Sequence, residues 1–244
     1  MPEIYLVGGA VRDSLLGLQS KDLDYTYVAD NTKSIEAAYS EMKEYMLSEG
    51  FNIFLETPDC LTIRAKFPDS SRHKGLVGDF VLARKESGNY YSGTRKPIVI
   101  PGTLEDDLSR RDFTINAIAQ CTKTGELIDL FNGKEHIKVK WLTTPLPVME
   151  TFLDDSLRVI RLLRFSIQLR FTINPYILDV IHEEVDLLVD KTKETVSADR
   201  IRQELGKAFK VDSYATFNKL QLFPSKLVKC WFPEGMWLQP TFKQ

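Results

Sequence analysis

The sequence predicts an α+β protein, in which a head of mixed strands and helices is followed by an all-α portion. In the first half of the chain, short apolar runs with alternating or β-branched residues are separated by glycine turns. From Glu150 onward the apolar residues recur at helical spacing instead, and the change falls near Pro145 and Pro147. A shift from strands to helices is typical of an α+β head joined to a helical part.

The head is predicted to begin with a strand, a turn and a helix. Residues 4–7 are a short apolar run, and residues 10–16 have helical character. Gly8 and Gly9 lie between them, where backbone N–H groups at a helix N-terminus can approach a phosphate. Arg12 would add a charged fork to such a site. Glycine pairs are also ordinary turns, so this segment alone is a weak signal.

The next strand carries two carboxylates. Because side chains of a strand alternate between its faces, Asp22 and Asp24 are expected on one side, with Cα atoms roughly 6.5 Å apart. Leu23, Tyr25 and Tyr27 would then face the core. Two such carboxylates can hold a pair of Mg²⁺ ions about 4 Å apart, which activate an attacking hydroxyl and stabilise a leaving pyrophosphate. An Asp-x-Asp pair is also common on solvated edges, so its neighbours decide the interpretation.

The rest of the head is predicted as one helix and three strands, namely residues 34–50 and residues 51–55, 61–67 and 77–82. The polar stretch 68–74 suits a hairpin connection, and residues 90–101 read as an exposed, mobile loop. Asp79 lies among apolar residues of the last strand and could join Asp22 and Asp24 as a third carboxylate, although a lone strand Asp usually faces solvent.

The clearest predicted helices of the second part are residues 154–169, 176–189 and 197–209. In the first of these, Arg158, Arg161 and Arg164 recur at three-residue spacing among apolar residues, which suits a local patch that binds RNA. A solvated amphipathic helix has the same pattern, and both interpretations stay open.

The composition excludes several classes of protein. With 43% hydrophobic and 27% charged residues among 244, the chain is globular and not disordered. A net charge of -2 denies it the basic field of a non-specific nucleic-acid binder. Its three cysteines contain no CxxC pair, which argues against a disulfide framework and a zinc site and favours free thiols in a reducing cytoplasm. No stretch suits a secretion signal or a membrane span.

Five segments in order resemble the signatures of one family. They are residues 8–13 with 22–24, then 110–117, 127–133, 154–161 and 197–205. Together they resemble the class II tRNA nucleotidyltransferase and bacterial poly(A) polymerase family. The resemblance implies a polymerase-β-like nucleotidyltransferase head over residues 1–145, a helical neck over 146–194 and a short helical body or tail over 195–244.

The resemblance also implies roles for individual residues. Asp22 and Asp24 would hold Mg²⁺, and Asp79 would be a third catalytic carboxylate that helps to activate the hydroxyl. The implied nucleotide-binding residues comprise a triphosphate cradle, a set that contacts triphosphate or sugar, the base readers and one further arginine. They are, in that order, Gly8, Gly9 and Arg12; Arg111, Asp112 and Asn116; Asp155 and Arg158; and Arg161.

The implied base readers have chemistry that can be tested from first principles. A carboxylate such as Asp155 accepts from the amino group of cytosine or adenine, and Arg158 donates to the adjacent ring nitrogen. Uracil and guanine present the opposite pattern, which would leave unpaired groups at a cost of about 1–3 kcal/mol each. The alternative is an ordinary helical ion pair. The fourth signature of the family normally begins with Glu, where this chain has Asp154.

The expected function is Mg²⁺-dependent addition of C, C and A to the 3′ end of tRNA from CTP and ATP. Poly(A) synthesis and A-only addition stay open. CC-only addition is disfavoured because the loop 87–103, which the resemblance implies helps the switch from C to A, has its full length. An inactive RNA-binding accessory protein is the alternative of another class. A dinucleotide-dependent oxidoreductase ranks last, since Gly8 and Gly9 lack a GxGxxG turn. Because the chain ends soon after its fifth signature, weaker or shared RNA binding is expected; the oligomeric state is left undecided.

Overall fold

The computed structural model describes residues 3–20, 22–30, 33–71, 73–90, 97–233 and 235, with the backbone alone for residues 86–90, 97 and 98. The chain forms two compact units, Met1–Val139 and Lys140–Gln244. The boundary lies before the predicted one at residue 145. The finer division of the helical part into neck and body stays a prediction.

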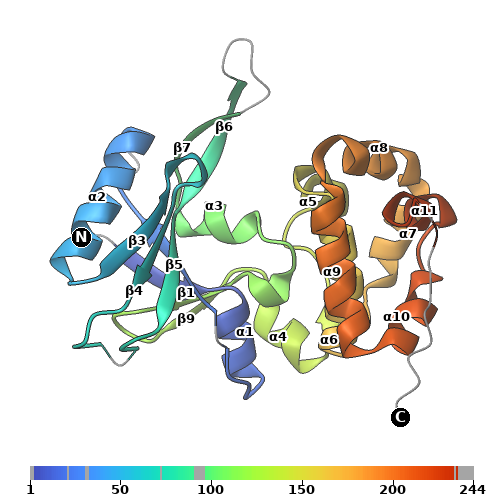
Figure 1. Cartoon of the computed structure of the whole chain (residues 1–244), viewed down its shortest axis with the longest axis horizontal. Coiled ribbons are helices and arrows are strands. Elements are labelled where there is room, and N and C mark those ends of the chain that lie inside the picture. Colours follow the sequence, from blue (N-terminus) through green and yellow to red (C-terminus); the bar gives the residue numbers. More distant parts are fainter. Residues whose placement is uncertain are drawn as a thin grey trace. The chain divides into compact units, whose positions relative to one another are not determined.

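The first unit is built on a seven-stranded mixed sheet with the order β3-β4-β5-β2-β1-β8-β9 (Figure 1). Its strands are β1 (Glu3–Val7), β2 (Leu23–Val28), β3 (Asn52–Thr57), β4 (Thr62–Lys66), β5 (Val77–Leu82), β8 (Ile118–Cys121) and β9 (Leu127–Asp129). Strands β2 and β5 are parallel, and the other neighbouring pairs are antiparallel. A separate hairpin pairs β6 (Arg84–Tyr90) with β7 (Pro97–Pro101).

Helices cover the two faces of this sheet unequally (Figure 1). On one face α2 (Ile35–Ser48), which is capped by Ser34, packs Met42 and Met46 against Tyr25, Tyr27 and other buried residues. The opposite face has a smaller cluster that includes Val7 and Leu108 of α3 (Leu104–Ser109). The other helical elements of this unit are α1 (Gly9–Leu15), α4 (Gly133–Lys138) and the 3-10 turns η1 (Pro58–Cys60) and η2 (Thr114–Asn116).

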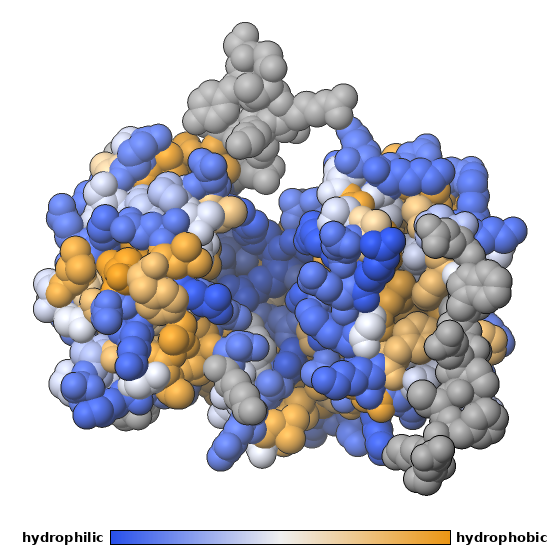
Figure 2. All heavy atoms as spheres, viewed as in Figure 1, coloured by the Kyte–Doolittle hydropathy of each residue, from blue (hydrophilic) through white to orange (hydrophobic). Residues whose placement is uncertain are grey.

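Some large apolar side chains of the head stay at its surface. Phe54 and Leu55 of the edge strand β3 are 57% and 50% exposed, and Leu76 and Val77 at β5 are also exposed. Figure 2 shows apolar residues gathered on this side of the head. The sheet core therefore lies under α2, and β3 contributes little to it.

The second unit is helical. It contains α5 (Val148–Asp154), α6 (Leu157–Gln168), α7 (Pro175–Glu183), α8 (Val185–Thr195), α9 (Ala198–Val211), α10 (Ser213–Leu220) and α11 (Ser225–Trp231), with a short parallel pair β10 (Trp141–Leu142) and β11 (Thr172–Ile173). Helix α6 is its centre, since Ile160, Leu162 and Leu163 are fully buried. Within the described residues no helix has both the length and the apolarity to cross a membrane. The cysteines Cys60, Cys121 and Cys230 are free, as predicted.

Most predicted elements are confirmed, and three predictions need correction. The helix predicted from residue 154 begins at Leu157, because Asp155 is extended with φ -146° and ψ 104°. The helix predicted over 176–189 is two helices that meet at Glu184. Part of the predicted loop 90–101 is strand β7, whose β-branched residues suit a hairpin. Residues 91–96 of that loop, which are also part of the predicted long loop 87–103, lie outside the described residues.

Candidate active site

Strand register places two of the predicted carboxylates side by side. Asp24 of β2 is the register partner of Asp79 of β5, and Asp79 is the partner of Arg64 of β4. Side chains at paired positions share one face of a sheet, on strands about 4.8 Å apart. Arg64 Nε lies 3.1 Å from Asp79 Oδ1. The backbone hydrogen bonds of the sheet therefore fix a row of two acids and one arginine.

Asp22 and Asp24 differ in their surroundings. Asp22 is exposed and directly precedes β2, whereas Asp24 lies within the strand and is half-buried. Leu23, Tyr25 and Tyr27 are buried, as the alternation predicted. Burial raises the pKa of the Asp24 carboxyl, Arg111 lowers it, and the charges of Asp79 and Asp22 raise it further. The three acids are thus close enough to repel one another, which is the environment that a cation relieves.

The glycine turn lies against this acid cluster. Gly8 has φ 71° and ψ -136°, a backbone conformation that other residues rarely adopt. A Cβ added to Gly8 would lie 2.9 Å from Arg111 Nη1 and 3.9 Å from Asp24 Oδ2. The site therefore needs glycine at this position for its conformation and for the space. Gly9, the first residue of α1, is the next residue of the same turn.

Arg111 is held by two residues that were not predicted as part of the site. Its Nη2 donates to Asp107 Oδ2 at 2.8 Å and to Thr26 Oγ1 at 3.4 Å. Burial acts to raise the pKa of Asp107, but the ion pair with Arg111 and the hydrogen bonds outweigh it and lower the pKa. The i,i+4 spacing of Asp107 and Arg111 was the available signal in the sequence.

Arg12, Asp112 and Asn116 form a buried network. Arg12 Nη1 donates to Asn116 Oδ1 at 2.7 Å, and Asn116 Nδ2 donates to Asp112 Oδ1 at 2.9 Å. Arg12 also pairs with Asp13 at 2.6 Å. The three predicted residues are only 5–7% exposed, and they connect α1 to η2 behind the glycine turn. Their arrangement supports the turn, and direct contact with a nucleotide stays a prediction.

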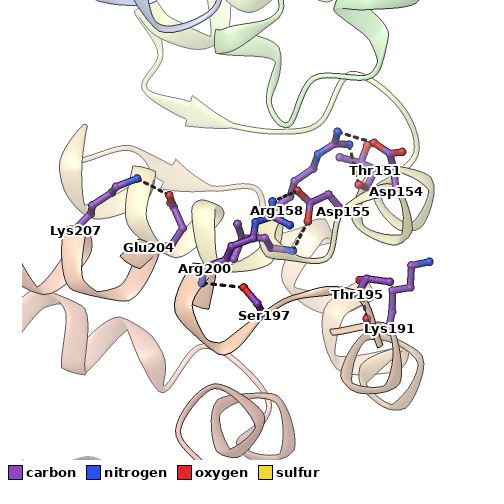
Figure 3. Close-up of polar contacts among 11 residues, drawn as sticks. Thr151, Asp154, Asp155, Arg158, Lys191, Thr195, Ser197, Arg200, Glu204 and Lys207 are labelled. Atoms are coloured by element: carbon purple, nitrogen blue, oxygen red, sulfur yellow. Dashed lines mark hydrogen bonds and ion pairs between the residues drawn. The ribbon is translucent and has the colours of Figure 1, made fainter. Parts of the chain in front are cut away.

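In the helical unit, the predicted base readers are held by ion pairs (Figure 3). Asp155 Oδ1 accepts from the backbone N–H of Leu157 at 3.1 Å, and Asp155 Oδ2 accepts from Arg200 Nη2 at 2.9 Å. Arg158 Nη1 donates to the carbonyl of Thr151 at 3.0 Å, and Arg158 Nη2 lies 2.6 Å from Asp154 Oδ2. Asp154 and Arg200 thus belong to this site. Both lie in the segments that resemble family signatures, but neither was predicted to have a role.

The predicted RNA patch of three arginines is not a single exposed patch. Arg164 is 8% exposed, and its Nε lies 2.5 Å from Glu204 Oε2 of α9. Its guanidinium also lies 3.9 Å from the ring centre of Phe165, and that of Arg161 lies 5.4 Å from it. Residues at three-residue spacing do not stay on one line of a helix but move gradually around it, and the third arginine faces α9. Arg164 is therefore a core residue of the helical unit.

The donor set of the head fits Mg²⁺ without forming a complete metal site. Across the described part of the chain, no three His, Cys, Asp or Glu side chains converge as metal ligands. Mg²⁺ is usually held by one or two carboxylates together with water and substrate phosphates. Asp22 and Asp24 provide two carboxylates in an acidic cluster, which matches that requirement.

Residues 4–143 match the family model of the poly(A) polymerase head domain. This match spans more than half of the chain. The chain belongs to this family. The expected family and fold class are thereby confirmed, and three of the five segments that resemble family signatures fall within the matched residues.

Known relatives agree with the family assignment. The chain is 35% identical over 217 residues to the tRNA nucleotidyltransferase cca2 of Schizosaccharomyces pombe, a match that covers 85% of this chain and 43% of the relative. It is similar to a solved CCA-adding enzyme complexed with ATP, at 26% identity and TM-score 0.71, covering 97% of this chain and 49% of that one. It is also similar to the CTP complex of the Bacillus stearothermophilus CCA-adding enzyme, at 27% identity and TM-score 0.67, covering 88% and 46%. The chain thus spans about half the length of these relatives.

Proposed function

We propose that this chain carries the catalytic part of an RNA nucleotidyltransferase that adds C and A to the 3′ end of tRNA from CTP and ATP without a nucleic-acid template. The observation that carries the proposal is the convergence of Asp24, Gly8 and Arg111 within the head. The relatives of known name support it, since they include a tRNA nucleotidyltransferase and CCA-adding enzymes solved with ATP and CTP.

In the head, the residues would act on the triphosphate. Asp22 and Asp24 would hold Mg²⁺, which supplies activation of the RNA 3′-hydroxyl and neutralisation of the leaving pyrophosphate. Arg111 lies at the glycine turn, where its planar guanidinium can donate to phosphate oxygens in pairs. Gly8 lets the backbone approach those oxygens without a side chain between them. Asp79, next to Asp24, would help to accept the proton of the attacking hydroxyl.

In the helical unit, Asp155 and Arg158 would read the incoming base. The carboxylate accepts from the amino group that cytosine and adenine share, and the guanidinium donates to the neighbouring ring nitrogen. Uracil and guanine would place a carbonyl against the carboxylate and an N–H against the guanidinium. Each buried mismatch of this kind costs about 1–3 kcal/mol, which corresponds to roughly 5-fold to 150-fold selection.

Several finer points belong to the proposal. Addition of A alone, long poly(A) tails and CC-only addition are other products that the same head could make. Magnesium as the resident ion and a cytoplasmic location are expected from the sequence, as is the tRNA 3′ end as partner. An inactive RNA-binding role is disfavoured because Asp22, Asp24 and Asp155 are all present.

Primer extension tests the proposal directly. Purified protein is incubated with tRNA transcripts that end before CCA, after C and after CC, with each nucleoside triphosphate alone and with all four, plus Mg²⁺. Ordered growth by C, C and A that then stops is the expected result, and Asp22→Ala should abolish it. Long A tails would indicate poly(A) synthesis. Binding of tRNA without any extension would refute catalysis and favour an accessory role.

A further inference from the structure

We propose that Arg200 is a positioning residue that aims the carboxylate of Asp155, so that helix α9 sets the accuracy of base selection. The inference rests on the proposed function, because it assigns Asp155 to base reading. It adds a residue on another helix to that reading pair (Figure 3).

Asp155 lies at a place where its own backbone does not belong to a helix. Helix α5 ends at Asp154 and α6 begins at Leu157, and Asp155 is extended between them. A side chain at such a junction depends on its contacts for its direction. The Leu157 N–H engages one carboxylate oxygen at 3.1 Å and Arg200 engages the other at 2.9 Å. With one donor on each oxygen, the plane of the carboxylate is fixed.

Arg200 is itself anchored from two directions. Ser197 caps α9 by accepting from the Arg200 backbone N–H at 3.4 Å. Four residues further along, on the same face of α9, Glu204 forms the buried ion pair with Arg164 of α6 at 2.5 Å. The buried Arg164–Glu204 pair, which we call the α6–α9 clamp, holds α9 against α6. Arg200 lies one turn before Glu204 on the same face of α9, and from there it contacts Asp155. The buried pair therefore fixes the position from which Arg200 orients the Asp155 carboxylate.

The pair leaves Asp155 able to work. Each carboxylate oxygen has two acceptor positions, so a donor on each oxygen leaves capacity for the amino group of a base. Arg200 and Asp155 are 49% and 30% exposed at their side chains. Exposed ion pairs of this kind contribute little to stability. The Arg200–Asp155 pair is therefore expected to affect the orientation of the carboxylate more than the stability of the fold.

The test compares three variants in single-nucleotide extension of a tRNA that ends before CCA. Arg200→Ala removes the contact, Arg200→Lys keeps the charge without the planar fork, and Arg202→Ala is the matched control. Arg202 lies on the same helix in an exposed pair with Asp199, with side chains 72% and 82% exposed. The measurement is kcat/KM for CTP relative to UTP, with KM for CTP and for tRNA determined separately.

Arg200→Ala is expected to lower the preference for C over U about tenfold, mainly through KM for CTP, because the carboxylate loses its fixed direction. Arg200→Lys should lie between Arg200→Ala and the unmodified protein, and Arg202→Ala should match the latter. On an Asp155→Ala background, Arg200→Ala should add no further loss of preference, since both changes remove the same function.

Other results would overturn the inference. If Arg200→Ala raises KM for tRNA and leaves the C-over-U preference unchanged, Arg200 contacts RNA and does not position Asp155. If the two changes are additive, Arg200 acts independently of Asp155. If the unmodified protein adds neither C nor A, the proposed function fails and the inference fails with it. This result differs from the first two, because in those the unmodified protein extends the tRNA.

Discussion

The two candidate sites of this chain are held in place by different forces. In the head, Asp24, Asp79 and Arg64 lie in a row because three strands pair in one register. In the helical unit, Asp155 lies between two helices and is held by a side chain from a third. The first arrangement depends on backbone hydrogen bonds, and the second depends on ion pairs.

This difference predicts how each site responds to substitution. Removal of a head side chain takes away its chemistry while the strands keep the other residues in place. Removal of a partner in the helical unit changes the direction of a reader that is still present. Head variants should therefore lose rate, whereas helical variants should lose selectivity or stability.

The largest expected effect is that of Asp24→Asn. Loss of a metal-binding carboxylate should reduce extension by at least about 10³-fold. Burial has the largest influence on the Asp24 carboxyl, and it raises the folded-state pKa. This carboxyl therefore stabilises the fold most at low pH, and that stabilisation is lost as the pH rises through the folded pKa. Asn avoids that loss, so the variant should melt higher than the unmodified protein at pH 8, with a smaller difference at pH 4.

Extension assays and thermal melts across that pH range measure both effects. The exposed Asp59→Asn is the matched control in the same unit, and it should change neither rate nor melting. A melting temperature for Asp24→Asn below that of the unmodified protein at pH 8 would contradict the desolvation of Asp24.

The next effect is on stability, from Glu204→Ala. The variant leaves Arg164, 9% exposed at its side chain, without its buried carboxylate partner. Breaking a buried ion pair from one side costs about 3–5 kcal/mol. Burial acts to raise the pKa of Glu204, but Lys207 and Arg164 outweigh it and lower the pKa. The ordinary pKa of a glutamate carboxyl is 4.5, and the unmodified protein should lose this stabilisation as the pH falls below that value. The stability of Glu204→Ala should depend less on pH in this acidic range.

Urea unfolding followed by circular dichroism measures this loss. Asp199→Ala, which breaks the exposed pair with Arg202, is the control and should cost less than about 1 kcal/mol. Equal losses from the two variants would show that the α6–α9 clamp is not the stabilising contact.

Asp154→Ala should have a smaller effect, on selectivity. Asp154 holds Nη2 of Arg158 at 2.6 Å, and its removal leaves the guanidinium freer to turn. We expect a loss of C-over-U preference of about 3-fold, less than for a missing reader, because the Thr151 carbonyl still holds Nη1. Asp154→Glu, which places the residue usual in the family at this position, should retain the preference. If Asp154→Ala instead reduces the incorporation of all four nucleotides equally, Asp154 supports the fold and does not orient Arg158.

The local parts of this architecture could be predicted from the sequence. Strand β5 was predicted at its observed bounds, and the alternation around Asp22 and Asp24 placed Leu23, Tyr25 and Tyr27 in the core. These predictions succeeded because the alternation of apolar and polar residues along a strand shows which side chains lie on its buried face and which on its other face.

The long-range contacts could not be predicted in the same way. Arg12 and Asn116 are 104 residues apart, and Asp155 and Arg200 are 45 apart. No local period records such a pairing. The break at Asp155 was also missed, since the apolar spacing that predicts a helix continues through it, and the backbone there is decided by tertiary contacts.

Arg64→Ala should have the smallest effect, and it tests the comparison most finely. Arg64 and Asp79 are 46% and 33% exposed, so their pair contributes little to stability. Arg64 also lowers the pKa of Asp24, against the larger effect of burial. Without that positive charge the pKa of Asp24 rises and less of the carboxylate is ionised at a given pH. Extension should therefore fall by about 2-fold on the acidic side of the activity profile and by less at pH 8. Arg64→Lys keeps the charge and should keep the profile. A large loss at every pH would mean that the head site, like the helical one, depends on a side-chain pair for its geometry, and the contrast between the two units would fail.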